Sequence, residues 1–268
     1  MELDPNSIIV HLKDKTTPIV ILFGPHSCGK TIMTFRLAHW LMGQGYYVES
    51  DRNFRLCNEF YKKACDLFEE VVHGDFDYVE GAQMIHFMLV RVMNKYGEPI
   101  CQILEAPGQH YFDYTYPNHE FPMYINELCT ADNPKIWMFI VERNWKDAKD
   151  RLNYANKIIK MQSLIKPSDR VIFTCHKSDL HPALIYAGKP KPDVPQFFKD
   201  IKDQYPGIFS KYENKNPISR LWRKYNFDFV VFSAGTFNPT ADGGQRYNPS
   251  KERNPASLWK AITKNLKK

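Results

Sequence analysis

Short apolar runs rich in β-branched residues recur along the chain and predict buried β-strands. The first, residues 18–23, is continuously apolar, which is typical of a strand covered on both faces. Turn residues at 94–99, including Gly97, predict that the second and third runs form a hairpin. Residues 46–48 fit either a short strand or an extended exit from the preceding helix. The predicted strands span residues 18–23, 85–93, 100–104, 136–141, 171–175 and 227–232.

Between these runs, apolar residues at three- and four-residue steps predict amphipathic helices. Asp51 and Asp193 are predicted N-caps, and Asn216 with Pro217 predicts another helix start. A polar loop is expected around Gly243 and Gly244. The predicted helices span residues 31–41, 51–74, 123–130, 147–165, 193–205, 216–225 and 256–266. In the helix at 147–165, the expected inner face carries Leu152, Ala155, Ile158, Ile159 and Leu164.

Strands that alternate with helices predict an α/β fold with a mostly parallel sheet of about six strands. The hairpin adds one antiparallel strand, and helices should cover both faces of the sheet. Most predicted strands end in polar residues, so a ligand is expected at the carboxyl edge. We expect a single domain over residues 1–268, with a helical insertion at about 181–225.

Composition and charge narrow the class of protein. With 43% hydrophobic residues the chain can bury a substantial core. The net charge of +6 is mild and the basic residues interleave with acids, so no nucleic acid is expected as a partner. Six cysteines without a C-x-x-C pair fit reduced thiols. No signal peptide or transmembrane segment is recognisable, which favours a cytoplasmic location.

Residues 24–31, Gly-Pro-His-Ser-Cys-Gly-Lys-Thr, match the P-loop pattern G-x-x-x-x-G-K-[ST] at every fixed position. The two glycines allow a tight turn that presents backbone N–H groups to phosphate, and the loop lies between a predicted strand and a predicted helix. A lysine then reaches the β- and γ-phosphates, and a hydroxyl holds Mg²⁺. The expected nucleotide contacts in this loop are Gly24, His26, Ser27, Cys28, Gly29, Lys30 and Thr31.

A second polar strand end begins at Glu105, with Gly108 three residues later. This spacing would let a carboxylate reach Mg²⁺ while a backbone N–H meets the γ-phosphate. By itself the spacing is weakly specific. Together with Thr31, it makes Glu105 the second expected metal ligand.

In their order along the chain, these motifs resemble the P-loop GTPase superfamily, in its Ras-like and translation-factor-related branch. Residues 105–108 resemble its D-x-x-G motif, with Glu in place of Asp. Residues 176–179, His-Lys-Ser-Asp, resemble its [NT]-K-x-D motif, and Ser233-Ala234 resembles its fifth motif. The enlarged segment after the first helix is also similar to bacterial double-GTPase-like proteins. The resemblance implies a three-layer P-loop NTPase fold and binding of GTP or GDP with Mg²⁺.

The same resemblance implies roles for individual residues. Gln109 would orient the attacking water, and Lys30 would stabilise the charge that develops on the phosphates. Asp179 would select guanine, because its carboxylate can accept hydrogen bonds from N1–H and the exocyclic amine, whereas adenine offers an acceptor at N1. The remaining nucleotide contacts implied are Gly108, His176, Lys177, Ser233 and Ala234.

Three departures from the family pattern bear on hydrolysis. No threonine occurs from residue 35 to residue 114, so the switch threonine is missing or is replaced, with Ser50 as one candidate. His26 is bulkier than the glycine common at its position, and Glu105 is one methylene longer than Asp. These features predict slow or partner-activated GTP hydrolysis, with segments 50–84 and 109–122 contacting an effector or activator.

Two alternatives stay open at this point. The first is a nucleotide-binding interaction module with little hydrolysis. The second is an ATP-dependent P-loop phosphotransferase, to which the insertion would supply Arg220 and Arg223.

Overall fold

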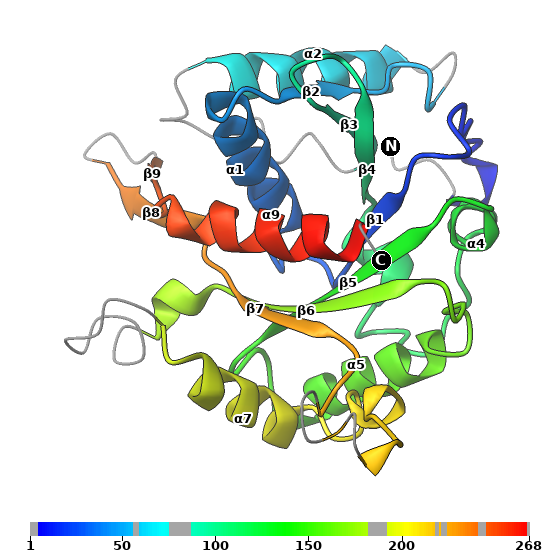
Figure 1. Cartoon of the computed structure of the whole chain (residues 1–268), viewed down its shortest axis with the longest axis vertical. Coiled ribbons are helices and arrows are strands. Elements are labelled where there is room, and N and C mark those ends of the chain that lie inside the picture. Colours follow the sequence, from blue (N-terminus) through cyan, green and yellow to red (C-terminus); the bar gives the residue numbers. More distant parts are fainter. Residues whose placement is uncertain are drawn as a thin grey trace.

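The computed structural model describes residues 5–55, 59–74, 87–181, 192–217, 220, 224–240 and 245–266. Within them, seven strands form one sheet in the order β2-β3-β4-β1-β5-β6-β7, and β8 pairs with β9 in a separate hairpin (Figure 1). The strands are β1 Ile19–Phe23, β2 Tyr47–Ser50, β3 Met88–Met93, β4 Pro99–Glu105, β5 Lys135–Glu142, β6 Arg170–His176, β7 Asp228–Val231, β8 Gly235–Pro239 and β9 Gln245–Pro249.

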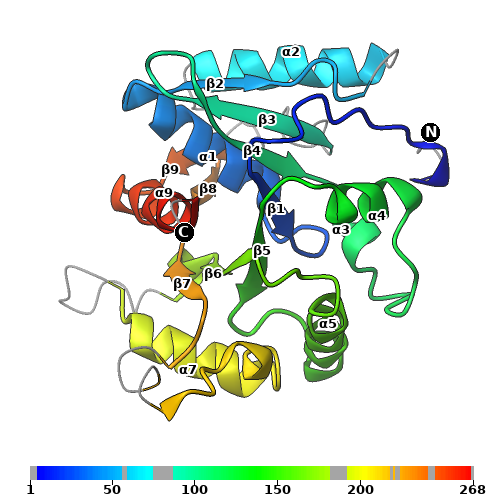
Figure 2. The same ribbon diagram turned by 45° about the vertical axis from the view of Figure 1, so that its right-hand side comes forward.

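Helices lie on both faces of the sheet (Figures 1 and 2). α1, α2 and α9 are on one face, where α1 contacts both of the others, and α5 and α7 are on the other. The described helices are α1 Lys30–Gly43, α2 Glu59–His73, α3 Gly108–Tyr111, α4 Met123–Thr130, α5 Ala148–Met161, α7 Val194–Gln204 and α9 Arg253–Leu266, with 3-10 turns at Pro5–Ser7, Ser178–Leu180 and Ser210–Tyr212.

The sheet follows the predicted pattern with one added strand. β3 is antiparallel to both β2 and β4, and the other pairings in the sheet are parallel. The open alternative at residues 46–48 is settled, because Tyr47–Ser50 is strand β2. The predicted α/β fold class, with a mostly parallel sheet and one antiparallel strand, is confirmed.

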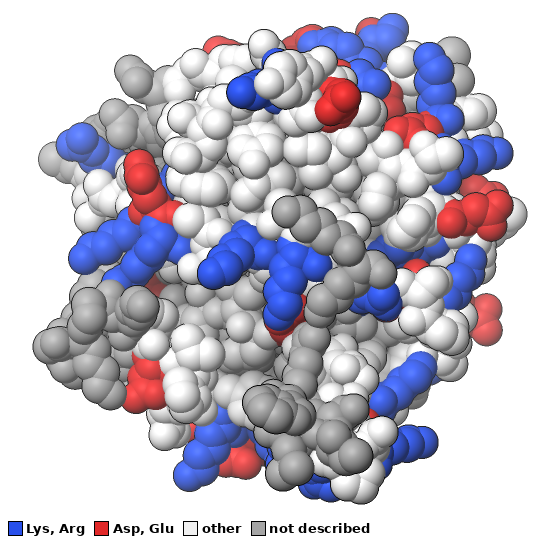
Figure 3. Space-filling view, viewed as in Figure 1, with Lys and Arg blue, Asp and Glu red and all other residues white. Residues whose placement is uncertain are grey.

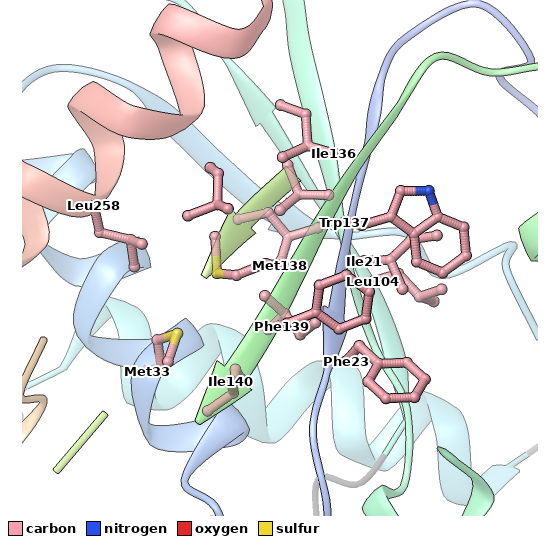
Figure 4. Close-up of a cluster of buried hydrophobic side chains, with 14 of the residues drawn as sticks. Ile21, Phe23, Met33, Leu104, Ile136, Trp137, Met138, Phe139, Ile140 and Leu258 are labelled. Carbon is pink, nitrogen blue, oxygen red and sulfur yellow. The ribbon is translucent and has the colours of Figure 1, made fainter. Parts of the chain in front are cut away.

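The core is built around β1 and β5, every residue of which is buried. Figure 4 shows side chains of β5 alternating between the two faces of the sheet. Met138 lies toward Met33 of α1 and Leu258 of α9, whereas Phe139 packs against Phe23, with ring centroids 5.3 Å apart. Because both faces are covered, these strands read as continuous apolar runs.

Several local predictions were wrong. Leu152 and Ile159 are 46% and 39% exposed, because Tyr154, stacked on Phe23 at 6.3 Å, sets which face of α5 is buried. Leu164 is 39% exposed and lies beyond Met161, where α5 ends. Ala155 and Ile158, on the same predicted face, are buried as expected. Asp51 is not the N-cap of α2 and instead accepts a hydrogen bond from the Asn53 amide in a turn ahead of that helix. By contrast, Asp193 caps α7 as predicted. Asp147, the predicted start of its helix, is the N-cap of α5.

Other predictions fall partly or wholly outside the described residues. These are the start of the strand at 85–93, the interior of the helix at 216–225, and the loop residues Gly243 and Gly244. The expected loop after Ser233 is a hairpin, β8–β9, where it is described. Of the six cysteines, Cys57 is outside the described residues and the other five are buried and free, as expected for reduced thiols.

Surface charge is mixed in sign. Figure 3 shows Lys and Arg near Asp and Glu over the face viewed, with several basic side chains along the band where α9 lies. Lys264 of α9 pairs with Asp228 at 2.5 Å. In the part of the chain that the structure describes, no helix combines the length and apolar character needed to cross a bilayer.

Candidate nucleotide-binding site

The candidate site lies along one edge of the sheet. β1, β4, β5, β6 and β7 run parallel, so their carboxyl ends meet at the same edge. The residues at or just after these ends are the predicted P-loop, Glu105, Glu142, the 176–179 motif and Ser233. This convergence at one edge is the arrangement that α/β proteins use to bind ligands.

The 24–31 segment has the backbone of a phosphate-binding loop. Ser27 and Gly29 have positive φ angles of 61° and 86°, and α1 begins at Lys30. Alternation of left-handed and right-handed residues turns successive N–H groups toward one concave surface, next to the positive end of the helix dipole. The loop can therefore bind an anion through its backbone.

Lys30 is folded back onto this loop. Its ammonium donates to the carbonyl oxygens of Gly24 at 3.0 Å and Pro25 at 2.9 Å, and the residue is 6% exposed. These bonds compensate for burial of the charge and hold the ammonium inside the loop curve. Cys28 is also buried here, where burial raises the pKa of its thiol and favours the neutral form.

Thr31 and Glu105 are brought together as predicted. The Thr31 hydroxyl donates to Oε1 of Glu105, which is 2% exposed at the end of β4. Burial raises the pKa of Glu105 to about 7, although the Thr31 bond and the charge of Lys30 oppose the shift. Oε2 of Glu105 is buried without a hydrogen-bond partner among the described residues. The pair thus offers hard oxygen donors, one of them unsatisfied.

Gly108 lies directly against the P-loop. A Cβ at this position would be 2.2 Å from the backbone nitrogen of His26, a separation that only glycine avoids. Gln109 follows in the first turn of α3, and the His26 side chain is exposed. The next residues are anchored in the core, since Tyr111 is fully buried and its ring lies 4.9 Å from that of Phe23.

The guanine-motif candidates lie beside the P-loop. Lys177 has a φ angle of 51° and donates to the carbonyl oxygen of Ser27 at 2.9 Å. The carboxylate of Asp179 accepts a hydrogen bond of 2.6 Å from the Ser233 hydroxyl. Ala234 is buried next to Ser233, and its carbonyl accepts from the Tyr247 hydroxyl at 2.5 Å, which ties the strand end to the β8–β9 hairpin.

His176 is wedged between the P-loop and the end of β7. Its ring stacks on Phe232 at 5.4 Å, and a Cβ added to Gly29 would lie 2.6 Å from its Cε1 atom. Burial lowers the pKa of His176 to about 3, and the neighbouring Lys177 adds to this shift. The imidazole is therefore neutral at physiological pH, and its ring packs between the P-loop and the end of β7.

This neutral ring predicts a pH-dependent stability. The pKa of His176 in the folded state lies below its ordinary value of 6.5, so its stabilising contribution is present above pH 6.5 and is lost as the pH falls toward 3. At pH 5 the loss relative to pH 7.5 is expected to be about 2 kcal/mol.

Urea unfolding of the wild type and of His176→Asn at both pH values measures this contribution, since other groups titrate in both proteins. The raised pKa of Glu105 has the opposite effect on the free energy of unfolding, and this effect is present in both proteins. Equal pH dependence of the two proteins would show that the ring is protonated without cost in the fold.

One predicted feature, the candidate switch hydroxyl of Ser50, is not brought to the P-loop. The Ser50 hydroxyl donates to Glu69 of α2 at 2.7 Å, and strands β3 and β4 separate β2 from β1. Ser50 is thus held away from the position of a switch hydroxyl in this conformation. Of segment 50–84, residues 56–58 and 75–84 lie outside the described residues.

Sequence reasoning missed the contacts that Glu142, Phe232 and Arg143 make in the fold. Glu142 forms a 3.0 Å ion pair with Lys177. It could have been found, since it is an acid at the end of a buried strand, as Glu105 is. The contacts of Phe232 and Arg143 depend on distant segments and leave no comparable local signal.

The fold and the loop geometry define an α/β protein with a P-loop at the carboxyl edge of its sheet. No protein-family model and no curated protein sequence matches the chain.

Solved structures that are similar to it include the following two. One is described as nucleolar GTP-binding protein 1 from Plasmodium falciparum, with 13% identity over 97% of this chain and 90% of that one, and a TM-score of 0.45. The other is a mutation variant of a protein called SsGBP, with 11% identity and a TM-score of 0.39. The match covers 94% of this chain but only 57% of the SsGBP chain. Similarity of this extent does not identify the ligand.

Proposed function

We propose that this protein is a cytoplasmic GTP-binding protein that hydrolyses GTP to GDP and phosphate and acts as a molecular switch. The observation that carries the proposal is the convergence of two half-sites at one sheet edge. Lys30, Thr31 and Glu105 form the phosphate half, and Lys177 and Asp179 form the base half. Because each half-site has its own contact with the P-loop, one nucleotide could span the two half-sites.

The base half supports guanine over adenine. The Ser233 hydroxyl occupies one oxygen of Asp179 and fixes the orientation of the carboxylate. A carboxylate held in this way can accept from the N1–H and amine of guanine, whereas it would face the lone pair at N1 of adenine. Lys177 would lie along the base while still bonded to the loop at Ser27.

The phosphate half fits Mg²⁺. Thr31 and Glu105 supply adjacent oxygens, and the buried Oε2 of Glu105 has no hydrogen-bond partner in the described ranges. Oxygen ligands shared between protein and phosphates are what Mg²⁺ prefers. When bound, the ion would neutralise charge on the phosphate oxygens. Glu105 would need to be ionised for this role, and its pKa of about 7 makes that possible at neutral pH.

The chain's own residues have separate roles in the proposed hydrolysis. The P-loop amides and Lys30 would bind and orient the phosphates, and Gln109 would orient a water for attack on the γ-phosphorus. As the water oxygen bonds to phosphorus, the bond from phosphorus to the β–γ bridging oxygen breaks, GDP leaves, and a proton of the water passes to the phosphate that forms. Gly108 allows α3 to approach the loop closely enough for its neighbour to act there.

An interaction module with little hydrolysis is the second candidate. It is favoured by Ser50, whose hydroxyl and backbone amide are both bonded to Glu69 and so do not supply a switch hydroxyl. A partner could bind through the exposed part of segment 109–122, where Tyr116 is 70% exposed. Such a partner could also raise the hydrolysis rate by supplying an arginine, which is worth about 10³ to 10⁵ in other systems.

The proposal is tested by titration calorimetry with GTP, GDP and ATP in the presence of Mg²⁺. We expect GTP and GDP to bind at least about tenfold more tightly than ATP, a difference of about 1.4 kcal/mol or more. Equal affinities for ATP and GTP would contradict it. Single-turnover hydrolysis then separates the two candidates, because tight GTP binding with hydrolysis at the uncatalysed rate would favour the interaction module.

A further inference from the structure

Glu142 is a buried carboxylate that the nucleotide site as proposed does not use. Its side chain is 9% exposed at the end of β5, and its Oε1 atom lies 3.0 Å from Nζ of Lys177. Burial raises the pKa of this carboxyl, while the charge of Lys177 lowers it. The Lys177 side chain is 33% exposed, and an ion pair with one partner in contact with solvent contributes little to stability. Its presence beside the base motif therefore calls for another role.

Lys177 has two fixed contacts on the protein. Its ammonium donates to the Ser27 carbonyl of the P-loop at 2.9 Å and pairs with Glu142 on another strand. A lysine side chain is flexible and its ammonium is a point charge, so one contact alone leaves the four-carbon stem free to move. The second contact, from Glu142, restricts the stem to one path across the site.

Glu142 is itself held by the predicted insertion. The hydroxyl of Tyr205, at the end of α7, donates to the carbonyl oxygen of Glu142 at 2.8 Å, and Tyr205 is 1% exposed. The next residue, Arg143, donates to Asp200 of α7 at 2.6 Å, and its guanidinium also lies 3.0 Å from Nδ1 of His181.

Asn144 completes this contact. Its backbone amide donates to Gln204 at 2.7 Å, and the Gln204 side-chain amide donates back to Asn144 at 2.9 Å. Three consecutive residues, the last of β5 and the two that follow it, are thus bonded to α7 or to Tyr205 at its end. α7 fixes the backbone from which the Glu142 side chain extends.

We propose that Glu142 is a positioning residue that orients Lys177 for the nucleotide, and that the insertion holds Glu142 in place through α7. The inference rests on the proposed function, since it concerns the same base half-site. The insertion would thereby contribute to nucleotide binding through a series of contacts. These run from Tyr205 to Glu142, from Glu142 to Lys177, and from Lys177 to Ser27 of the P-loop.

A double-mutant cycle on the full chain tests the inference, with GDP as the probe and Mg²⁺ present. Glu142→Gln keeps the shape of the side chain but removes its charge, and we expect the Kd for GDP to rise about tenfold. In the Lys177→Met background the same substitution should change the Kd less than about twofold, because its target is gone. Tyr205→Phe should act in the same direction, more weakly, and should also be silent in that background.

The controls separate positioning from general destabilisation. Glu127→Gln removes an exposed carboxylate on α4 and should leave the Kd unchanged. A merely structural role of Glu142 would give the same fold-change with and without Lys177, and that additivity would overturn the inference. If Glu142→Gln does not fold, Tyr205→Phe replaces it in the cycle, and an equal fold-change with and without Lys177 would again overturn the inference. A wild type that does not bind GDP would instead overturn the proposed function itself.

Discussion

Replacing Asp179 with Asn is expected to weaken binding of GTP and GDP by about 10² to 10³-fold. The carboxylate would accept two hydrogen bonds from guanine, and bonds to a charged group contribute about 1.5 to 3 kcal/mol each. The Asn amide can accept one of these but presents an N–H₂ group in place of the second oxygen. Because xanthine carries a carbonyl where guanine carries its amine, that N–H₂ group suits xanthine. Xanthosine diphosphate should therefore bind the variant more tightly than GDP does.

The measurement is competition of GTP, GDP and xanthosine diphosphate for wild type and variant. The Ser233 hydroxyl can still donate to Asn, so the local fold should be retained. Asp203→Asn, an exposed carboxylate on α7, is the matched control and should leave all affinities unchanged. A variant that keeps its preference for guanine would show that Asp179 does not contact the base, and the guanine assignment would be lost with it.

The parts of the site that could be predicted are those set by local sequence. The P-loop needs two glycines, Lys30 and Thr31 within eight positions, and nothing distant changes that requirement. Likewise β1 and β5 are buried on both faces, so their apolar runs identify them unambiguously. Parallel strands then bring Glu105 and the 176–179 motif to the same edge without any further information.

The parts that could not be predicted depend on contacts between distant residues. The β8–β9 hairpin reads as a polar loop, with Pro239 and Asn238 in its first strand, and its ends are held by Tyr247 and by the bond from Arg36 to Ser250. Tyr154 determines which face of α5 is buried. A tyrosine has both an apolar ring and a polar hydroxyl, so the periodicity of apolar positions did not indicate that it faces the core.

The link from α7 to Arg143 joins residues 57 positions apart and so leaves no local pattern. Glu142 differs from these cases. Its position at a strand end was visible in the sequence, but its partner, Lys177, was not.

Replacing Gly29 with Ala is expected to destabilise the fold by about 2 to 5 kcal/mol and to abolish measurable nucleotide binding. The φ angle of 86° is left-handed, which costs an L-residue about 1 to 2 kcal/mol. The new Cβ would also lie 2.6 Å from Cε1 and 3.1 Å from Nδ1 of His176. That ring is 4% exposed and stacked on Phe232, so it cannot move aside, and overpacking adds about 1 to 3 kcal/mol.

Urea unfolding of Gly29→Ala, of His176→Ser and of the double variant separates the two costs. If the ring causes the clash, the double variant should be about 1 to 3 kcal/mol more stable than the sum of the single effects, while the backbone cost remains. Gly43→Ala is the control, because nothing lies within 4 Å of its Cβ position and it should be neutral or slightly stabilising. Additive effects would show that His176 yields to the new methyl group. In that case the ring could not couple the P-loop to the end of β7 through packing.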